Sequence, residues 1–189
     1  MKKNAIILAL AVLAVIGVWL WDRGGDDPGG TDQATASTPV GEIPQTPAPK
    51  ANRFAPAFEL ATLDGTASYS VGGKRDKALI VNFWAAWCGP CEEEAPDLKA
   101  IYEEHRENLD LYAVNATNFD KLREAKDFVK EQGFDDFPVL TDAEGVAGDL
   151  YKVTGYPVSF IIDRDGVIRH RIEGVIPREQ WEIFLRDVL

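Results

Sequence analysis

Two cysteines separated by only two residues are the feature of the sequence that most directly suggests chemistry. Cys88 and Cys91 stand in the run Trp87-Cys88-Gly89-Pro90-Cys91, and the chain contains no other cysteine. A two-residue spacer places the sulfurs about one helical turn apart, close enough to form a small disulfide ring or to open as a dithiol. The spacing therefore predicts reversible thiol–disulfide exchange.

The position of the pair along the chain indicates a different role for each cysteine. The cysteines follow a predicted strand and begin a predicted helix. The free N–H groups and partial positive charge of a helix N-terminus favour thiolate over thiol, which makes Cys88 the nucleophile. Cys91 falls on the apolar stripe of the helix, so we expect it to be more buried and to act as the resolving thiol that releases a mixed disulfide.

Two other interpretations of the pair stay open on the residues alone. A static disulfide would persist outside the cytoplasm, but the loop it closes is so short that it would constrain the unfolded chain only weakly. A zinc site would need two further ligands, and the two histidines, His105 and His170, are not spaced as a second pair. We expect neither a metal nor another cofactor.

The elements that must hold the cysteines alternate between strands and helices. Residues 78–84 form a short, continuous apolar run of β-forming residues, which predicts a buried strand, and residues 109–115 predict another. Between these strands, apolar positions recur at three- and four-residue spacing and predict a helix whose stripe is Cys91, Ala95, Leu98, Ile101 or Tyr102, and His105.

The remainder of the domain continues this alternation and ends in a hairpin. Leu122, Ala125, Phe128 and Val129 predict a helix that ends near Gly133, and residues 137–140 predict a short strand. The turn sequence at 163–166 separates strands at 159–162 and 167–172, and a last helix is predicted to begin near residue 177. The pattern predicts an α/β domain with a central mixed β-sheet flanked by helices on both faces, in which the strand at 78–84 is a middle member.

Length and charge exclude several classes of protein. The 189 residues have room for one ordinary domain with extra segments, and the 46% hydrophobic content is typical of a folded chain. Lys and Arg number 20 against 31 Asp and Glu, a formal net charge of −11, which argues against a nucleic-acid partner.

The first fifty residues differ from the rest. Lys2 and Lys3 precede an uncharged apolar run from Ala5 to Trp21, which as a helix of ~26 Å nearly spans a hydrocarbon core. A cleaved secretory signal is the alternative, but the run is longer than such a core and ends in large aromatic residues. We predict an N-terminal single-pass membrane anchor or signal at 1–22, a flexible Gly/Pro-rich linker at 23–52, and a folded domain at 53–189. The basic N-terminus favours an extracytoplasmic domain.

Three segments carry a resemblance to a known family. Residues 81–91 resemble the active-site segment of the thioredoxin superfamily, and Glu92-Glu93-Glu94-Ala95-Pro96 resembles its membrane-anchored TlpA/ResA/DsbE-like branch. Residues 155–163 resemble the segment that carries the superfamily's cis-proline, here Pro157. The resemblance covers about residues 55–189 and implies a thioredoxin-like fold. It also implies that Pro157 lies opposite the dithiol. Trp87 and Tyr156 would then flank the sulfurs as apolar contact surface, with ordinary packing as the alternative for each.

Two positions depart from the pattern, and one of them affects proton transfer. Where cytoplasmic thioredoxin is expected to have a buried Asp that moves the proton of the second cysteine, this chain has Asn82. Glu94, at i+3 from Cys91, offers a replacement if burial raises its pKa. The alternative is that Glu94 belongs to a solvated acidic run with Glu92 and Glu93. The second departure is Val158-Ser159, where the family more usually continues with a Thr-rich segment, and this departure leaves the substrate preference open.

The resemblance implies a thiol–disulfide oxidoreductase that acts on protein disulfides. The implied role is reduction of the haem-attachment cysteines of apocytochrome c during cytochrome c maturation, with electrons from a membrane thiol carrier of the CcdA or DsbD kind. Alternatives are a thiol oxidant or a general disulfide exchange protein for other secreted clients, since the direction depends on a redox potential that the sequence does not reveal. A non-catalytic thioredoxin-like module that binds copper or a client is a further alternative.

Overall fold

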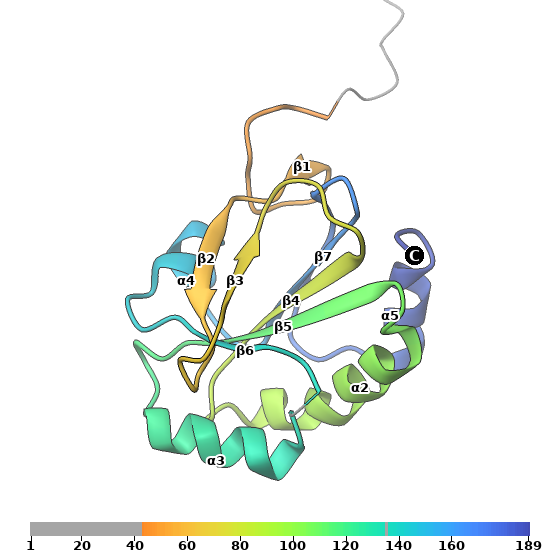
Figure 1. Cartoon of the computed structure of the whole chain (residues 1–189). Helices are drawn as coiled ribbons and strands as arrows, with labels where there is room; N and C mark the ends of the chain where they lie inside the picture. Colours follow the sequence, from red (N-terminus) through yellow and green to blue (C-terminus); the bar gives the residue numbers. More distant parts are fainter. Residues whose placement is uncertain (1–42, 135) are drawn as a thin grey trace, which may run out of the picture. The chain divides into compact units, whose positions relative to one another are not determined.

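A six-stranded mixed sheet organises the part of the chain that the computed structural model describes, residues 43–134 and 136–189 (Figure 1). The strand order is β1-β8-β7-β4-β5-β6, and a separate hairpin pairs β2 with β3. The strands are β1 (Arg53–Phe54), β2 (Phe58–Ala61), β3 (Ser68–Val71), β4 (Ala78–Trp84), β5 (Leu109–Asn115), β6 (Val139–Thr141), β7 (Val158–Ile162) and β8 (Val167–Glu173). The helices are α2 (Gly89–His105), α3 (Leu122–Gln132), α4 (Val146–Leu150) and α5 (Arg178–Leu185).

Strand β4 is the middle member that the sequence predicts. It runs parallel to β5 and antiparallel to β7, and all of its residues are buried. A strand covered on both faces must be apolar on both faces, which explains the continuous run of β-forming residues. Asn82 is the one polar residue in this run, and it is only 1% exposed. A buried amide in such a position needs hydrogen-bond partners.

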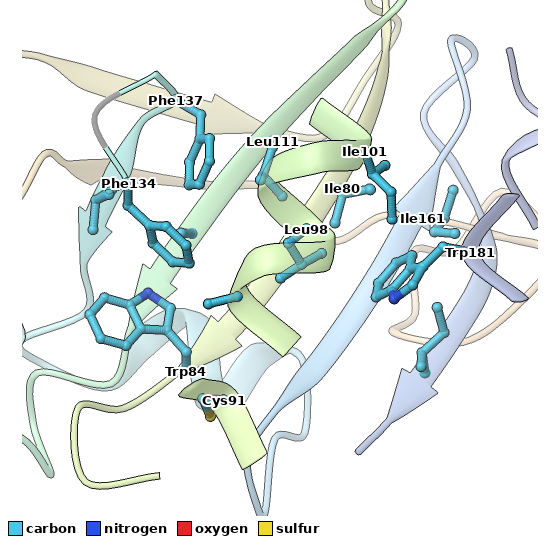
Figure 2. Packing of buried hydrophobic residues seen from close by; sticks show 14 of the residues in the cluster. Ile80, Trp84, Cys91, Leu98, Ile101, Leu111, Phe134, Phe137, Ile161 and Trp181 are labelled. Atoms are coloured by element: carbon cyan, nitrogen blue, oxygen red, sulfur yellow. The ribbon is translucent and has the colours of Figure 1, made fainter. Parts of the chain in front are cut away.

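One face of the sheet is covered by α2, α3 and α5. Leu98 and Ile101 of α2 and Trp181 of α5 are fully buried against Ile80 and Ile161 of the sheet, as Figure 2 shows. This arrangement confirms the apolar helical stripe predicted between the strands at 78–84 and 109–115. Near the other end of the cluster, Trp84 stacks on Phe128 of α3, with ring centroids 4.5 Å apart.

The opposite face is covered by α4 together with the β2–β3 hairpin. Tyr151, directly after α4, is fully buried, lies edge-on to Phe58 of the hairpin, and donates a hydrogen bond from Oη to the carbonyl of Pro56 at 2.8 Å. Helices on both faces were predicted, but α4 and the β2–β3 hairpin were not. A helix of five residues has too few turns to show a period, and the hairpin strands leave most of their residues exposed or half-buried.

The predicted terminal hairpin is confirmed, and its turn requires glycine. Gly166 has φ +83°, and a Cβ at this position would lie 2.3 Å from the carbonyl oxygen of Gly73. Asp163 closes the turn, since its Oδ1 accepts hydrogen bonds from the backbone N–H groups of Asp165 and Val167 at 3.0 and 2.9 Å. The following helix begins after Pro177, as predicted.

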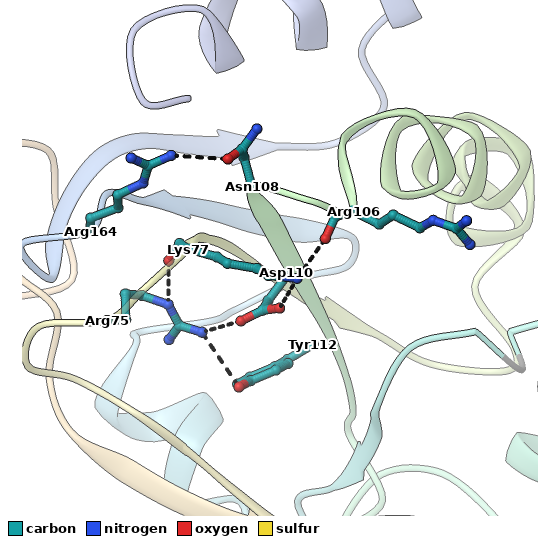
Figure 3. A network of polar contacts seen from close by, with 7 residues as sticks. All are labelled: Arg75, Lys77, Arg106, Asn108, Asp110, Tyr112 and Arg164. Carbon is teal, nitrogen blue, oxygen red and sulfur yellow. Dashed lines mark hydrogen bonds and ion pairs between the residues drawn. The ribbon is translucent and has the colours of Figure 1, made fainter.

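Polar contacts tie the starts of β4 and β5 together at the edge opposite the cysteines (Figure 3). Arg75 donates from Nη2 to Asp110 Oδ2 at 2.9 Å, and Lys77 donates from Nζ to the carbonyl oxygen of Arg106 at 2.6 Å. Both contacts join the segment before β4 to the region that leads into β5, and they accompany the parallel pairing that sets Ala78 opposite Leu109.

The predicted membrane segment from Ala5 to Trp21 and most of the predicted linker lie outside the described residues. Among residues 43–134 and 136–189, no helix is long and apolar enough to cross a bilayer.

Candidate active site

The cysteines lie where β4 ends and α2 begins. Cys88 is the N-cap residue of α2 in an extended conformation, and its Sγ accepts a hydrogen bond from the backbone N–H of Cys91 at 3.2 Å. The two residues form a disulfide with their Cα atoms 5.2 Å apart. An N-cap sulfur that receives a backbone N–H is in the position where a helix N-terminus stabilises negative charge after reduction. The geometry therefore suits Cys88 to the role of nucleophile.

The disulfide lies directly beneath the molecular surface. Cys88 is 5% exposed and Cys91 3%, so both are buried and Cys91 is the deeper by a small margin. The residues beside them are open to solvent: Trp87 is 59% exposed, and Gly89 and Pro90 are exposed as well. A partner chain that packs on these neighbours would thus come close to the sulfurs.

Glu94 is buried beneath the cysteine turn and does not belong to a solvated acidic run. It is 2% exposed, whereas Glu92 and Glu93 on the same helix are exposed, so the solvated interpretation of Glu94 is wrong. Its Oε1 accepts a hydrogen bond from Nδ2 of Asn82 at 2.6 Å. Burial in an apolar region raises the pKa of Glu94 from 4.5 to about 8, against the lowering effect of the Asn82 hydrogen bond. A carboxyl group with such a pKa can take up and release a proton near neutral pH.

The segment before β7 lies next to the cysteine turn. The Tyr156–Pro157 peptide bond is cis, and Pro157 is buried. The ring of Tyr156 meets the ring of Trp87 edge to face at 5.8 Å between centroids. The structure therefore brings Trp87 and Tyr156, 69 positions apart in the chain, together beside the disulfide.

The loop after β5 also belongs to the site, and the sequence analysis missed it. Phe119 is 69% exposed, and its carbonyl oxygen accepts a hydrogen bond from Trp87 Nε1 at 3.1 Å. The neighbouring Asp120 accepts from the backbone N–H of Ala86 at 2.6 Å. The carboxyl ends of β4 and β5 meet at one edge of the sheet because these strands are parallel neighbours. The available signal was that residues 116–120 directly follow a predicted strand.

An acidic groove borders the site on the side of α3. It has a volume of about 240 Å³ and lies between the start of α2 and α3, lined by Ala86, Glu92, Glu124, Asp127, Phe128, Glu131 and Gln132. Four carboxyl groups thus lie along one side of the segment that leads into the cysteines. This part of the surface attracts positively charged groups.

The two histidines lie in other parts of the fold. His105 is at the C-terminal end of α2, about 20 Å along the helix from Cys91. Its Nε2 lies 3.1 Å from Glu182 Oε2, and Glu104 lies in the same group. His170 stacks on Phe184 at 4.2 Å between centroids. Among the described residues, therefore, neither histidine is placed to complete a metal site on the two sulfurs.

Comparison with known proteins identifies the family. The model of the AhpC/TSA family matches residues 51–171. The chain belongs to this family. Thioredoxin-like protein YneN of Bacillus subtilis (strain 168) is 35% identical over 129 residues, which are 68% of this chain and 74% of YneN. Thiol-disulfide oxidoreductase ResA of Bacillus thuringiensis subsp. konkukian (strain 97-27) is 33% identical over 135 residues, 71% of this chain and 76% of ResA.

Solved structures agree with this family membership. The crystal structure of a thiol:disulfide interchange protein of the thioredoxin family from Chlorobium tepidum TLS superposes with a TM-score of 0.63 at 25% identity, covering 78% of this chain and 99% of that one. Within the AhpC/TSA family, the present chain thus has a thioredoxin-like fold. With its Cys-Gly-Pro-Cys disulfide at the start of α2, it is a thiol–disulfide oxidoreductase.

Proposed function

We propose that this thiol–disulfide oxidoreductase acts outside the cytoplasm as a reductant of protein disulfides, and that its clients include apocytochrome c during cytochrome c maturation. The observation that carries the catalytic part is a disulfide at a helix N-terminus with a buried acid three residues further along the same helix. The relatives named thiol-disulfide oxidoreductase ResA support the reaction type. The choice of client rests on the sequence resemblance to the TlpA/ResA/DsbE-like branch.

In the proposed reaction the reduced protein delivers two electrons. The Cys88 thiolate attacks one sulfur of the client disulfide, the client S–S bond breaks, and the other client sulfur leaves as a thiolate that takes up a proton from water. The Cys91 thiol then gives its proton to the Glu94 carboxylate, and the resulting thiolate attacks Cys88 Sγ. The mixed disulfide breaks, and the second client sulfur leaves as a thiolate that takes the proton back from Glu94. The client is reduced, and the protein is left with the Cys88–Cys91 disulfide.

Glu94 is suited to this step by the match between its pKa and that of a thiol. A carboxyl group with a pKa of about 8 accepts a thiol proton far more readily than an ordinary glutamate, because thiols ordinarily lose their proton near pH ~8.5. Both residues are buried on the same face of α2 at a spacing of three. An acid with the ordinary pKa of a glutamate would be a poor acceptor for a thiol proton.

The client would contact an aromatic surface formed by Trp87, Phe119 and Tyr156. Trp87 and Phe119 are exposed, and the hydrogen bond from the Trp87 indole to the Phe119 carbonyl holds them together. Backbone groups beside Pro157 would pair with an extended client segment. The proposal includes an anchor at residues 5–21 and a membrane thiol carrier of the CcdA or DsbD kind as electron donor.

The test uses the reduced chain and a disulfide-bonded peptide that contains Cys-x-x-Cys-His. We expect stoichiometric reduction of the peptide by the wild-type chain and none by Cys88→Ser. The redox potential of the couple should lie at or below ~−270 mV, near that of thioredoxin. A value near ~−120 mV would instead identify a thiol oxidant. Stoichiometric uptake of copper by a reduced chain that leaves the peptide oxidised would identify a binding module.

The aromatic surface has its own test. Trp87→Ala should lower kcat/KM for the peptide several-fold while leaving the reaction with a small disulfide, such as oxidised glutathione, nearly unchanged. Ile183→Ala is the matched control, because Ile183 is 46% exposed but lies on α5, which meets α2 at His105 and not at the cysteines. An equal loss for both substrates would indicate that Trp87 only supports the cysteine turn.

A further inference from the structure

Asn82, the departure from cytoplasmic thioredoxin, and Ser159 lie together beneath Glu94. They are directly opposite each other on the antiparallel strands β4 and β7. The amide nitrogen of Asn82 donates to Glu94 Oε1 at 2.6 Å and to Ser159 Oγ at 2.9 Å. All three side chains are buried, with exposures of 1% for Asn82, 2% for Glu94 and 2% for Ser159. Both N–H groups of the Asn82 amide are therefore used. One donates to Glu94, and the other donates to Ser159, which holds the amide in place.

These contacts make the two oxygens of Glu94 unequal. Oε1 accepts the Asn82 N–H, so in the protonated acid it acts as the carbonyl oxygen. Oε2 is buried and has no hydrogen-bond partner among the described residues. The exchangeable proton of Glu94 thus belongs on Oε2. A carboxylate would place an unpaired buried negative charge on the same atom, which is costly and favours the protonated form.

We propose that Asn82, anchored by Ser159, is a positioning residue that confines the exchangeable proton of Glu94 to Oε2 and sets the pH at which this proton is released. The inference rests on the proposed function in that Glu94 exchanges a proton with Cys91. An aspartate at position 82 would itself hold a proton, whereas an amide holds none and only orients the acid. In this chain the residue that carries the proton, Glu94, lies on α2, and the residue that orients it, Asn82, lies on β4.

Among the described residues, no charged side chain forms a hydrogen bond or ion pair with Glu94 that could take the place of the Asn82 contact. The strands below it present only the uncharged Asn82 and Ser159, and on its own helix Asp97 raises the pKa of Glu94 by charge repulsion. Cys91, also on α2, becomes a titratable thiol once the disulfide is reduced. Charged groups of α3 and α5 reach α2 elsewhere, at the groove beside Glu92, at Glu104 and at His105: Glu124, Asp127, Glu131, Arg178 and Glu182.

The direct test is an NMR titration of the Glu94 side-chain carboxyl carbon in the oxidised full-length chain. Because the Asn82 hydrogen bond favours the ionised form, Asn82→Ala should raise the midpoint by about one pH unit, a tenfold change in the ionisation constant. Ser159→Ala should raise it by less, since Asn82 keeps its contact with Glu94, and Ser159→Thr, which keeps the hydroxyl, should restore the wild-type midpoint. Asn115→Ala removes another buried amide, one that binds Asp120, and should leave the midpoint in place.

A kinetic measurement separates this inference from the proposed function. The rate at which reduced chain reacts with oxidised glutathione is followed against pH for wild type, Glu94→Gln, Asn82→Ala and the double variant. Asn82→Ala should shift the pH profile upward in the wild-type background and should cause no further shift with Glu94→Gln. The inference is overturned if Asn82→Ala leaves unchanged or lowers the midpoint of the NMR titration. It is also overturned if Asn82→Ala shifts the pH profile of the rate equally in the wild-type and Glu94→Gln chains. If Asn82→Ala does not fold, an unmoved midpoint in Ser159→Ala overturns it. A profile unchanged by Glu94→Gln would instead refute the proton relay.

Discussion

Replacement of Glu94 by glutamine should change how the stability of the protein depends on pH. The pKa of Glu94 is 4.5 in the unfolded chain and about 8 in the folded one, because burial disfavours its charged form. Between these two pH values the unfolded chain has lost the proton and the folded chain keeps it. The folded state therefore binds more protons, and its stability falls as the pH rises through this window.

The magnitude follows from the width of the window. Each pH unit within it removes about 1.4 kcal/mol from the free energy of unfolding. From pH 4.5 to pH 7 the loss attributable to Glu94 is about 3 kcal/mol. Glu94→Gln cannot ionise, so it lacks this loss. The difference in free energy of unfolding, variant minus wild type, should therefore rise by about 3 kcal/mol over this range, whatever its value at pH 4.5.

Urea unfolding of the oxidised chain at a series of pH values measures this difference. All other titrating groups are common to the two proteins and cancel, and the slope m serves as a check that the unfolded states are alike. Glu93→Gln removes the same charge from an exposed position one residue away, and its difference from wild type should be flat with pH. A flat difference for Glu94→Gln as well would refute the argument that burial raises the pKa of this acid.

Two further predictions concern the cysteines and a turn. Cys91→Ser should accumulate a mixed disulfide between Cys88 and the client peptide, visible by mass spectrometry as a peptide adduct that is lost on reduction. A Cys91→Ser chain that turns over normally would contradict the resolving role. Gly166→Ala should destabilise the fold by well over ~1 kcal/mol in urea unfolding, because it combines an unfavourable φ with a clash against the Gly73 carbonyl. Gly65→Ala is the control with φ +73° and open space around the Cβ, and it should cost only about 1 kcal/mol; equal costs would show that the clash is relieved.

The elements closest to the cysteines could be predicted because their signals are local. The strand at 78–84 is apolar at almost every position since it is buried on both faces, and the α2 stripe repeats with the helical period. The turn at Gly166 has a sequence that few other structures accept. The β2–β3 hairpin, in contrast, leaves most of its residues exposed or half-buried, so little in its pattern distinguishes it from a loop.

For the site, the sequence alone determined the chemistry of the sulfurs, the start of the helix and the choice of Glu94 as the acid on the same helical face as Cys91. Spacing along one chain segment is enough for this, because Cys88, Cys91 and Glu94 all lie at the start of one helix. Only the tertiary structure decided that Glu94 is buried and that Asn82 and Ser159 hold it, since β4 and β7 come together across 77 positions. The same is true of Phe119, which reaches Trp87 through the pairing of β4 with β5. Whether a carboxyl group is solvated or buried depends on what packs over it, and that is a property of the assembled sheet and helices.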